Sequence, residues 1–278
     1  MPIASDLQPS IQFIIGLTGD RKNNKYFREI EIQIALTEAM IKNQNSKIPG
    51  LEHLRPDKRD SLYRFSLDSE LKLEEMQEDQ QDIKKDGIKK VVLHICGHHT
   101  PRKPESQDNQ FGFRIAHKNG FYKTHEITAT LVSFLNTFPD LQDLHVVLHS
   151  CKTATSINPN DEAFTGSTMR DIISSLESQL QQESMEISIY GVEHKMNQSR
   201  KGYQLWLQKN SKSGIEEVKN PTFKNIVATL TKQEEDELPA DLPSTPEKSS
   251  EAGDQGDSPS SRAGWPTTKK NRSGFEKK

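Results

Sequence analysis

The sequence contains little cysteine and no long apolar stretch. Only two of its 278 residues are cysteines, Cys96 and Cys151. This is too few for a disulfide framework, so we expect a reducing compartment such as the cytoplasm. No stretch approaches the roughly 18 apolar residues that a membrane-spanning helix needs. Residues 1–10 also lack the charged and apolar regions of a signal peptide, so we expect no membrane span.

Neither sign of charge is in large excess. The chain has 37 Lys and Arg against 40 Asp and Glu, a formal net charge of −3, with a sequence pI near 6.3. Because binding to nucleic acid or to an anionic membrane surface usually requires a basic field, we expect neither as a partner.

The apolar content is low and unevenly distributed. The mean hydropathy of −0.80 indicates a polar appendage beside a folded domain. From Gln233 onward Glu, Asp, Ser, Pro and Lys dominate, and apolar residues are isolated. We predict a folded domain over residues 1–232 and a disordered polar tail over residues 233–278.

Within the domain, apolar runs alternate with helical patterns. This alternation predicts an α/β fold of three layers with a mostly parallel sheet. Strands are expected at 11–15, 61–67, 91–96, 144–149, 187–192 and 203–207, the last as an edge strand, with a hairpin at 111–122 around Asn119-Gly120. Helices are expected at 26–43, at 69–87 with Ser69 as N-cap, from Thr124 as N-cap to before Pro139, at 167–180 with Ser167 as its first residue, and at 221–230.

Two apolar runs stop abruptly at reactive side chains. Residues 91–99 read VVLHICGHH, and residues 144–151 read LHVVLHSC. Each run is typical of a buried strand in a parallel sheet. Since ligands and chemistry gather at the carboxyl ends of such strands, we expect a histidine and Cys151 at one edge of the sheet, about fifty residues apart in sequence.

Both segments resemble motifs of caspase-like peptidases, especially the CHAT branch with its separase-like domains. Residues 93–98, LHICGH, are similar to the family's H-x-S-G-H-G, and residues 146–154, VVLHSCKTA, are similar to its VVL-x-A-C-x-T-A/G segment. The resemblance spans roughly residues 11–207. It implies that His98 is the catalytic histidine, that Cys151 is the nucleophile, and that the oxyanion is held by the Cys151 amide and an amide near Gly97–His99. The family's glycine after the histidine is His99 here, which carries a cost if the backbone there has positive φ.

The residue types suit acyl transfer at a peptide carbonyl. A nearby imidazole lowers the pKa of a thiol and supplies a proton to the leaving amine. Either His98 or His99 could serve as this base. Further candidates for substrate contacts are Asp161 and Glu162, in the polar loop at 152–166, and Glu193 and His194, which end a later strand. Cys96, His94, His145 and His149 are expected to be packed within strands.

Two alternatives stay open from the sequence. One is a catalytically inactive caspase-like binding module, since a fold does not imply a function. The other is a zinc site formed from Cys96, His98, His99, His149 and Cys151, although no CxxC or HExxH spacing is present. Our prediction is a cysteine endopeptidase with a protein or peptide substrate, no cofactor and no metal. The sequence does not define its oligomeric state. The Asn-, Lys- and Gln-rich composition would also suit a bacterial effector delivered into a host cell.

Overall fold

The computed structural model describes most of the predicted domain. The described residues are 10–19, 27–43, 50–54, 61–76, 83–105, 107, 110–115, 120–158, 160, 162–180, 184–199, 202–208, 215–219 and 222–230. The predicted tail at 233–278 and the candidate residue Asp161 lie outside them.

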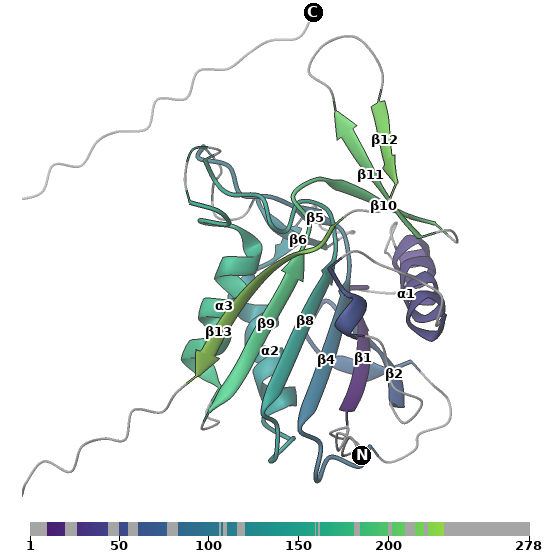
Figure 1. The fold of residues 1–278 in the computed structure, drawn as a ribbon, viewed down its shortest axis with the longest axis vertical. Coiled ribbons are helices and arrows are strands. Elements are labelled where there is room, and N and C mark those ends of the chain that lie inside the picture. Colours follow the sequence, from purple (N-terminus) through teal and green to yellow (C-terminus); the bar gives the residue numbers. More distant parts are fainter. Residues whose placement is uncertain are drawn as a thin grey trace, which may run out of the picture. The chain divides into compact units, whose positions relative to one another are not determined.

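One large sheet organises the described part of the chain (Figure 1). Its strands, in chain order, are β1 (Ser10–Gly16), β2 (Ser61–Leu67), β3 (Leu73–Glu75), β4 (Lys90–Cys96), β8 (Asp143–His149), β9 (Met185–Gly191) and β13 (Lys224–Leu230). Their order across the sheet is β13-β9-β8-β4-β1-β2-β3. The five inner strands are parallel, and β3 and β13 are antiparallel at the two edges. The predicted α/β class and mostly parallel sheet are confirmed.

Helices and smaller sheets surround this large sheet. The helices are α1 (Phe27–Lys42), α2 (Thr124–Leu135), α3 (Thr168–Gln179) and the 3-10 turn η1 (Glu52–Leu54). One small sheet contains β5 (His99–Thr100), β6 (Gly112–Ile115) and β7 (Gly120–Tyr122). Strands β6 and β7 pair antiparallel, as predicted for the hairpin, while its predicted turn residue Asn119 lies outside the described residues. The other contains β10 (Lys195–Ser199), β11 (Gly202–Gln208) and β12 (Ile215–Lys219).

The main hydrophobic core lies between one face of the large sheet and two of the helices. Alternate residues of β4 and β8, such as Leu93 and Val146, belong to this core. It also includes Leu131 of α2 and Ile172 of α3. Helices α2 and α3 therefore form one outer layer of the fold.

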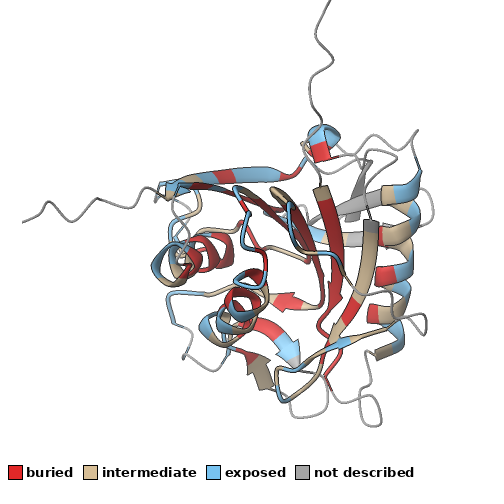
Figure 2. Cartoon of the chain, turned by 90° about the horizontal axis from the view of Figure 1, so that it is seen from below, coloured by how far each residue is buried: buried red, intermediate tan, exposed pale blue. Residues whose placement is uncertain are grey.

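The opposite face of the sheet is covered by α1 and by the segment around η1. There Cys96 packs with Ile30 and Ile34 of α1, and Val92 packs in a cluster that includes Leu54 of η1. Buried positions run along the strands and the inner sides of the helices (Figure 2). The fold therefore has three layers, as predicted.

An aromatic cluster fixes α2 against β1 and β2. The ring of Phe13 lies 4.9 Å from that of Phe134 in an edge-to-face arrangement, and 5.8 Å from those of Phe65 and Phe138. Such pairs stabilise a core by about 0.5–1.5 kcal/mol each beyond their burial. The cluster lies on the main-core face, so α2 is held on the side of the sheet away from α1.

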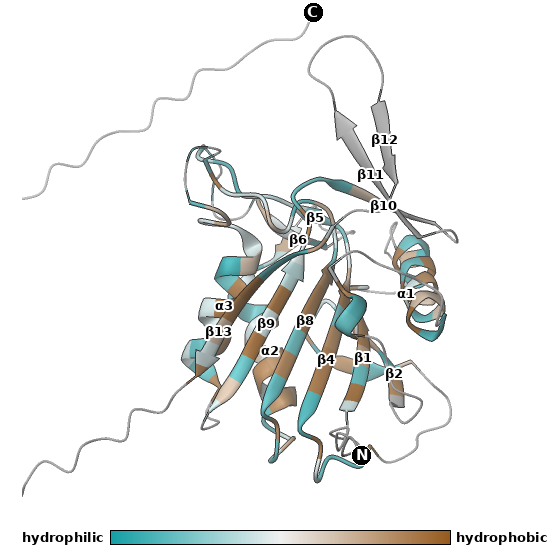
Figure 3. Cartoon of the chain, viewed as in Figure 1, coloured by the Kyte–Doolittle hydropathy of each residue, from teal (hydrophilic) through white to brown (hydrophobic). Residues whose placement is uncertain are grey.

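The α1 face of the sheet contains most of its buried polar side chains. Hydrophobic stretches along β1, β4, β8 and β9 are interrupted there by hydrophilic positions (Figure 3). His94 Nε2 lies 3.1 Å from Gln12 Oε1, and His94 Nδ1 lies 2.9 Å from His149 Nε2. Burial lowers the pKa of His94 to about 3 and that of His149 well below its usual value. Both imidazoles are therefore neutral, packed groups, as predicted for strand histidines.

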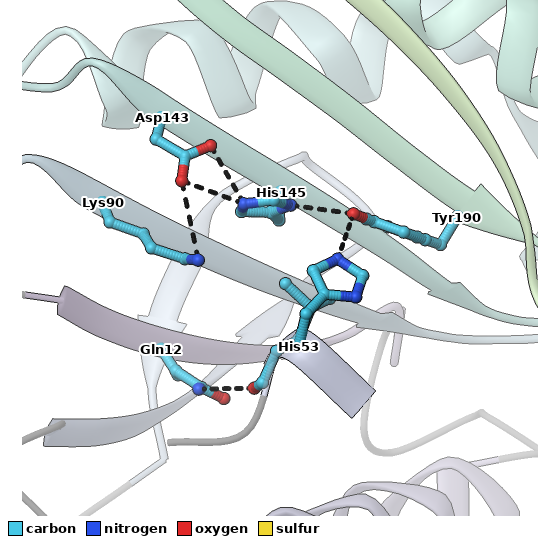
Figure 4. A network of polar contacts seen from close by, with 7 residues as sticks. Gln12, His53, Lys90, Asp143, His145 and Tyr190 are labelled. Atoms are coloured by element: carbon cyan, nitrogen blue, oxygen red, sulfur yellow. Dashed lines mark hydrogen bonds and ion pairs between the residues drawn. The ribbon is translucent and has the colours of Figure 1, made fainter. Parts of the chain in front are cut away.

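A second polar chain anchors η1 on this face (Figure 4). His145 Nε2 donates to Asp143, 3.0 Å from Oδ2, and Lys90 pairs with the same carboxylate. His145 Nδ1 lies 3.1 Å from the Tyr190 hydroxyl, and His53 Nε2 lies 2.7 Å from the same hydroxyl. With the hydrogen bond of 3.2 Å from Gln12 Nε2 to the Leu54 carbonyl, these contacts fix η1 to the sheet.

The predicted helix at 69–87 is wrong over the residues of this range that the structure describes, 69–76 and 83–87. Asp68 Oδ1 accepts from the amides of Glu70 and Lys72 at 2.8 and 2.9 Å, and Leu71 has a φ of 63°. This Asx turn reverses the chain, so that β3 pairs antiparallel with β2. Asp68, rather than Ser69, provides the local side-chain contacts, and these favour a turn over a helix start.

The predicted helix at 221–230 is also wrong. Lys224–Leu230 is the edge strand β13, antiparallel to β9. Ile226, Val227 and Thr229 are β-branched and favour a strand. Two smaller corrections concern boundaries. Helix α2 has Lys123, not Thr124, at its N-cap position, and β11 lies between β10 and β12 rather than at an edge.

Candidate active site

The predicted histidine and cysteine follow two neighbouring inner strands of the large sheet. Strands β4 and β8 are parallel neighbours in which Cys96 is opposite His149. His98 lies two residues beyond β4, and Cys151 lies two residues beyond β8. The Ser150 hydroxyl donates to the Gly97 carbonyl at 2.7 Å and ties the two turns together. The predicted arrangement of the two strands side by side is confirmed.

The Cys151 thiol lies against the backbone of β10. Its sulfur accepts from the Met196 amide at 3.3 Å and lies 3.4 Å from the Met196 carbonyl oxygen. Cys151 is half-buried, in contrast to Cys96, which is fully buried. Burial raises the pKa of the Cys96 thiol to about 12, partly offset by the hydroxyl of Thr37. Of the two thiols, Cys151 is therefore the one suited to reaction.

A sharp turn follows Cys151. Lys152 has a φ of 58°, a left-handed conformation that costs a residue with a β-carbon about 1–2 kcal/mol. Its amide donates to the His194 carbonyl at 3.0 Å, and the Ala154 amide donates to the Val192 carbonyl at the same distance. These two hydrogen bonds to the residues after β9 hold the turn, so the surrounding structure keeps Lys152 in its strained conformation. Strain of this kind is common at functional sites.

His98 is partly exposed and paired with a carboxylate. Its side chain is 38% exposed, and Nε2 lies 3.0 Å from Oε2 of Glu29, in the first turn of α1. Burial lowers the pKa of His98 below its usual value. The charge and hydrogen bond of Glu29 act in the opposite direction, and the charge of Arg114 lowers the pKa further. The imidazole is therefore accessible, and it is oriented by a group on another element.

His99, in contrast, is buried with both ring nitrogens engaged. Nδ1 donates to the Cys151 carbonyl at 2.7 Å, because a carbonyl can only accept, and Nε2 therefore accepts from the Thr168 hydroxyl at 2.7 Å. Burial lowers the pKa of His99 to about 4. His99 is not among the described residues with positive φ, so the backbone cost considered for this position does not arise. Its ring holds the backbone of Cys151.

Helix α1 reaches both strand ends through a polar stripe that the sequence interpretation missed. Glu29, Gln33 and Thr37 are spaced four residues apart and lie on one helix face. Gln33 Nε2 donates to the His149 carbonyl at 2.9 Å, and the Thr37 hydroxyl lies 3.5 Å from Cys96 Sγ. The periodic spacing beside the apolar stripe of α1 was the available signal, but polar residues next to such a stripe are usually solvated.

The remaining candidates lie around the Cys151 turn. The carbonyl of Glu193 accepts from the Thr155 hydroxyl at 2.8 Å, and the carbonyl of His194 accepts from the Lys152 amide. The side chains of both residues are exposed, as is Glu162 in the loop before α3. The structure thus brings Glu193 and His194 next to Cys151 through their backbones.

The five candidate zinc ligands have separate contacts. Cys96 contacts Thr37, His149 contacts His94, and His98 contacts Glu29. His99 is bonded through both nitrogens, and Cys151 lies against the Met196 backbone. Across the part of the chain that the structure describes, no three His, Cys, Asp or Glu side chains are grouped so that they could hold a metal ion. None of the helices in this part is long and apolar enough to cross a membrane.

Comparisons with known proteins give one structural similarity to report. No protein-family model matches the sequence, and no curated protein matches it. Among solved structures, the fold is similar to the X-ray structure of a secreted C11 cysteine protease from Bacteroides thetaiotaomicron in complex with an irreversible peptide inhibitor. The identity is 10% and the TM-score is 0.32; the match covers 67% of this chain and 49% of the other, so the chain matches about half the length of that protein.

Proposed function

We propose that this chain is a cysteine endopeptidase of the caspase-like type, with Cys151 as nucleophile and His98 as general acid and base. The observation that supports this most is that His98 and Cys151 follow neighbouring parallel strands at equivalent positions. The carboxyl ends of such strands are where open α/β sheets carry their chemistry. The finer assignment, to the CHAT branch with its separase-like domains, rests on the two sequence segments alone.

In the proposed reaction, His98 takes the proton of the Cys151 thiol, and the thiolate attacks the carbonyl carbon of the scissile peptide bond. The amides of Cys151 and of the Gly97–His99 segment hold the negative oxygen of the tetrahedral intermediate. The C–N bond then breaks, and the His98 imidazolium gives its proton to the leaving amine. Water, activated by the neutral imidazole, hydrolyses the thioester and restores the thiol.

The choice of His98 over His99 follows from their contacts. A base must have a nitrogen lone pair directed at the thiol, and the hydrogen bonds of His99 direct its two nitrogens to the Cys151 carbonyl and to Thr168. His98 is also the more exposed of the two. His99 then serves to hold the Cys151 backbone in place.

The expected substrate is a protein or peptide. Glu162 and Glu193 are exposed carboxylates on the chain segments that flank the Cys151 turn. With Asp161 and His194 they are the candidate substrate contacts. The negative charges of Asp161, Glu162 and Glu193 favour a basic residue in the substrate, because opposite charges steer and hold a ligand at close range.

The experiment that tests this function is labelling with peptide acyloxymethyl ketones that carry Arg, Lys, Asp or Leu before the reactive group. We expect mass spectrometry to find one label, on Cys151, and we expect Cys151→Ala and His98→Ala to abolish or strongly slow it. Cys96→Ser is the matched control and should label normally. Absence of labelling by every peptide, or labelling that is indifferent to His98, would leave a non-catalytic module with this fold.

A further inference from the structure

We propose that Glu29 is a positioning residue for His98, so that the site is a triad of Cys151, His98 and Glu29 from three separate elements. The inference rests on the proposed function and deepens it. It starts from one contact, the 3.0 Å between Glu29 Oε2 and His98 Nε2. At this distance the carboxylate forms an ion pair with the ring when the ring is protonated.

This contact selects the tautomer of His98. A carboxylate oxygen can only accept, so Nε2 carries the proton and the lone pair of the neutral ring is on Nδ1. Nδ1 is then the nitrogen that takes the thiol proton. When it does so, the ring becomes an imidazolium beside a carboxylate, an arrangement in which the negative charge stabilises the charged form. Glu29 thus favours the state that His98 must reach during acyl transfer.

Glu29 is placed by the same helix face that braces the two strand ends. Four and eight residues further along α1, Gln33 donates to the carbonyl of His149 and Thr37 contacts the sulfur of Cys96. Helix α1 also approaches β1 closely, since a β-carbon on Gly16 would collide with the side chain of Ile34. The helix cannot shift without breaking these contacts, so its first turn is held against His98.

The described charged groups that influence His98 belong to two elements. Glu29 comes from α1, and its charge and hydrogen bond raise the pKa of His98. Arg114 comes from β6, and its charge lowers that pKa, in the same direction as burial. Arg114 Nε is bonded to the Thr100 hydroxyl at 2.9 Å, which directs that side chain along the small sheet. Glu29 is therefore the group that opposes burial and Arg114 at the imidazole.

The decisive variant is Glu29→Gln, which keeps the size and hydrogen-bonding oxygen of the side chain but removes its charge. Glu31→Gln is the matched control, because Glu31 is on the same helix and the charge change is identical. Glu29→Asp keeps the charge but shortens the side chain, so it tests whether the carboxylate must reach the His98 ring. Each variant is made in the full chain and also combined with His98→Ala, and thermal unfolding checks that all are folded.

Two measurements are made on these variants. The first is an NMR titration of the His98 ring, in which Glu29→Gln should lower the pKa of His98 by about half a unit or more, as loss of an adjacent opposite charge does. The second is the rate of inactivation by the peptide acyloxymethyl ketone that labels Cys151. We expect Glu29→Gln to slow it about three- to tenfold at pH 7, a modest loss within the range for general acid–base groups. Glu29→Asp should recover part of the rate, and Glu31→Gln should leave both quantities unchanged.

The combined variants distinguish an effect of Glu29 that acts through His98 from a general effect of Glu29 on the structure. If Glu29 acts through His98, Glu29→Gln has no further effect once His98 is alanine. An equal loss in both backgrounds overturns the inference, as does a His98 titration identical in Glu29→Gln and Glu31→Gln. In either case the proposed peptidase stands as long as His98→Ala itself slows inactivation. Inactivation that ignores His98 overturns the proposed function instead, and the NMR titration still reports whether Glu29 and His98 are paired.

Discussion

The Ser150 hydroxyl donates to the Gly97 carbonyl at 2.7 Å, inside the protein, and joins the residue before Cys151 to the residue before His98. The backbone pairing of β4 with β8 ends at Cys96 and His149. This one side-chain bond continues the link between β4 and β8 to the candidate catalytic residues. Gly97 suits this position because it has no side chain. A β-carbon there would lie 3.2 Å from the side chain of Leu17.

Replacing Ser150 by alanine is expected to destabilise the domain and disturb the site. The Gly97 carbonyl would be left buried without this donor, which costs about 1–3 kcal/mol. Chemical denaturation should report this loss, and peptide-probe labelling of Cys151 should slow with it. The control is Ser178→Ala, an exposed helix position whose hydroxyl bonds to the Ser175 carbonyl. Equal stability of the two variants would contradict the role given to Ser150.

The buried histidines predict that the domain is sensitive to acid. The folded-state pKa values of His94, His99 and His149 lie below 6.5, so the unfolded chain binds more protons than the folded one as the pH falls below about 6.5. Stability is then full above that pH and declines by about 1.4 kcal/mol per pH unit for each histidine. Three together remove about 4 kcal/mol per unit, a large share of a typical 5–15 kcal/mol.

Urea denaturation between pH 7.5 and 5 measures this decline. His94→Gln removes one of the three groups and should reduce the slope of stability against pH by about a third. His125→Gln, at an exposed histidine on α2, is the control because it removes none of the three buried groups. A stability that stays flat from pH 7 to pH 5 would show that these histidines are not buried in the neutral form.

Cys96→Ser distinguishes a peptidase from a zinc protein, because both hypotheses use Cys151 but only one uses Cys96. Cys96 is packed against Thr37 with its sulfur fully buried, so the substitution should cost little stability and leave labelling of Cys151 intact. Metal analysis of the purified protein and the variant completes the test. Stoichiometric zinc that is lost in Cys96→Ser would refute the peptidase account.

Removal of residues 233–278 should leave the thermal unfolding of the remainder nearly unchanged. The composition of this segment offers little apolar surface to bury, so it contributes little to a folded core. Calorimetry of the full and shortened chains compares them directly. A shortened chain that melts many degrees lower would place the domain boundary elsewhere.

Elements that bury a continuous apolar run could be predicted from the sequence. Elements whose conformation depends on local side-chain contacts could not. The patterns of β4, β8, α1 and α3 are strong because each packs a continuous apolar face, and Ser167 caps α3 through the Arg170 amide as its residue type suggests. The sequence predicts a helix start at Ser69 because serine is a common cap residue and Glu70 follows it. In the structure Asp68 bonds to the amides of Glu70 and Lys72 instead, in the turn that leads to the pairing of β3 with β2.

The candidate site was predictable in part for the same reason. Cys151 and a histidine could be assigned to one sheet edge because strand ends are visible in the sequence. The choice between His98 and His99 required their surroundings, since Thr168 and the Cys151 carbonyl approach His99 from distant parts of the chain. Glu29 was not predictable, because its contact with His98 depends on how α1 crosses the sheet.

The most direct test of the central claim is the rate of Cys151 alkylation by iodoacetamide as a function of pH, in the unchanged protein and in His98→Ala. Cys96 is buried, with its pKa raised to about 12, so the native protein reports Cys151 alone. If His98 and Cys151 form a catalytic pair, alkylation is already fast well below pH 8, and His98→Ala slows it about tenfold or more at pH 7. If alkylation instead rises only near pH 8.5, as for a free thiol, and is the same without His98, the two residues do not act together and the claim is wrong.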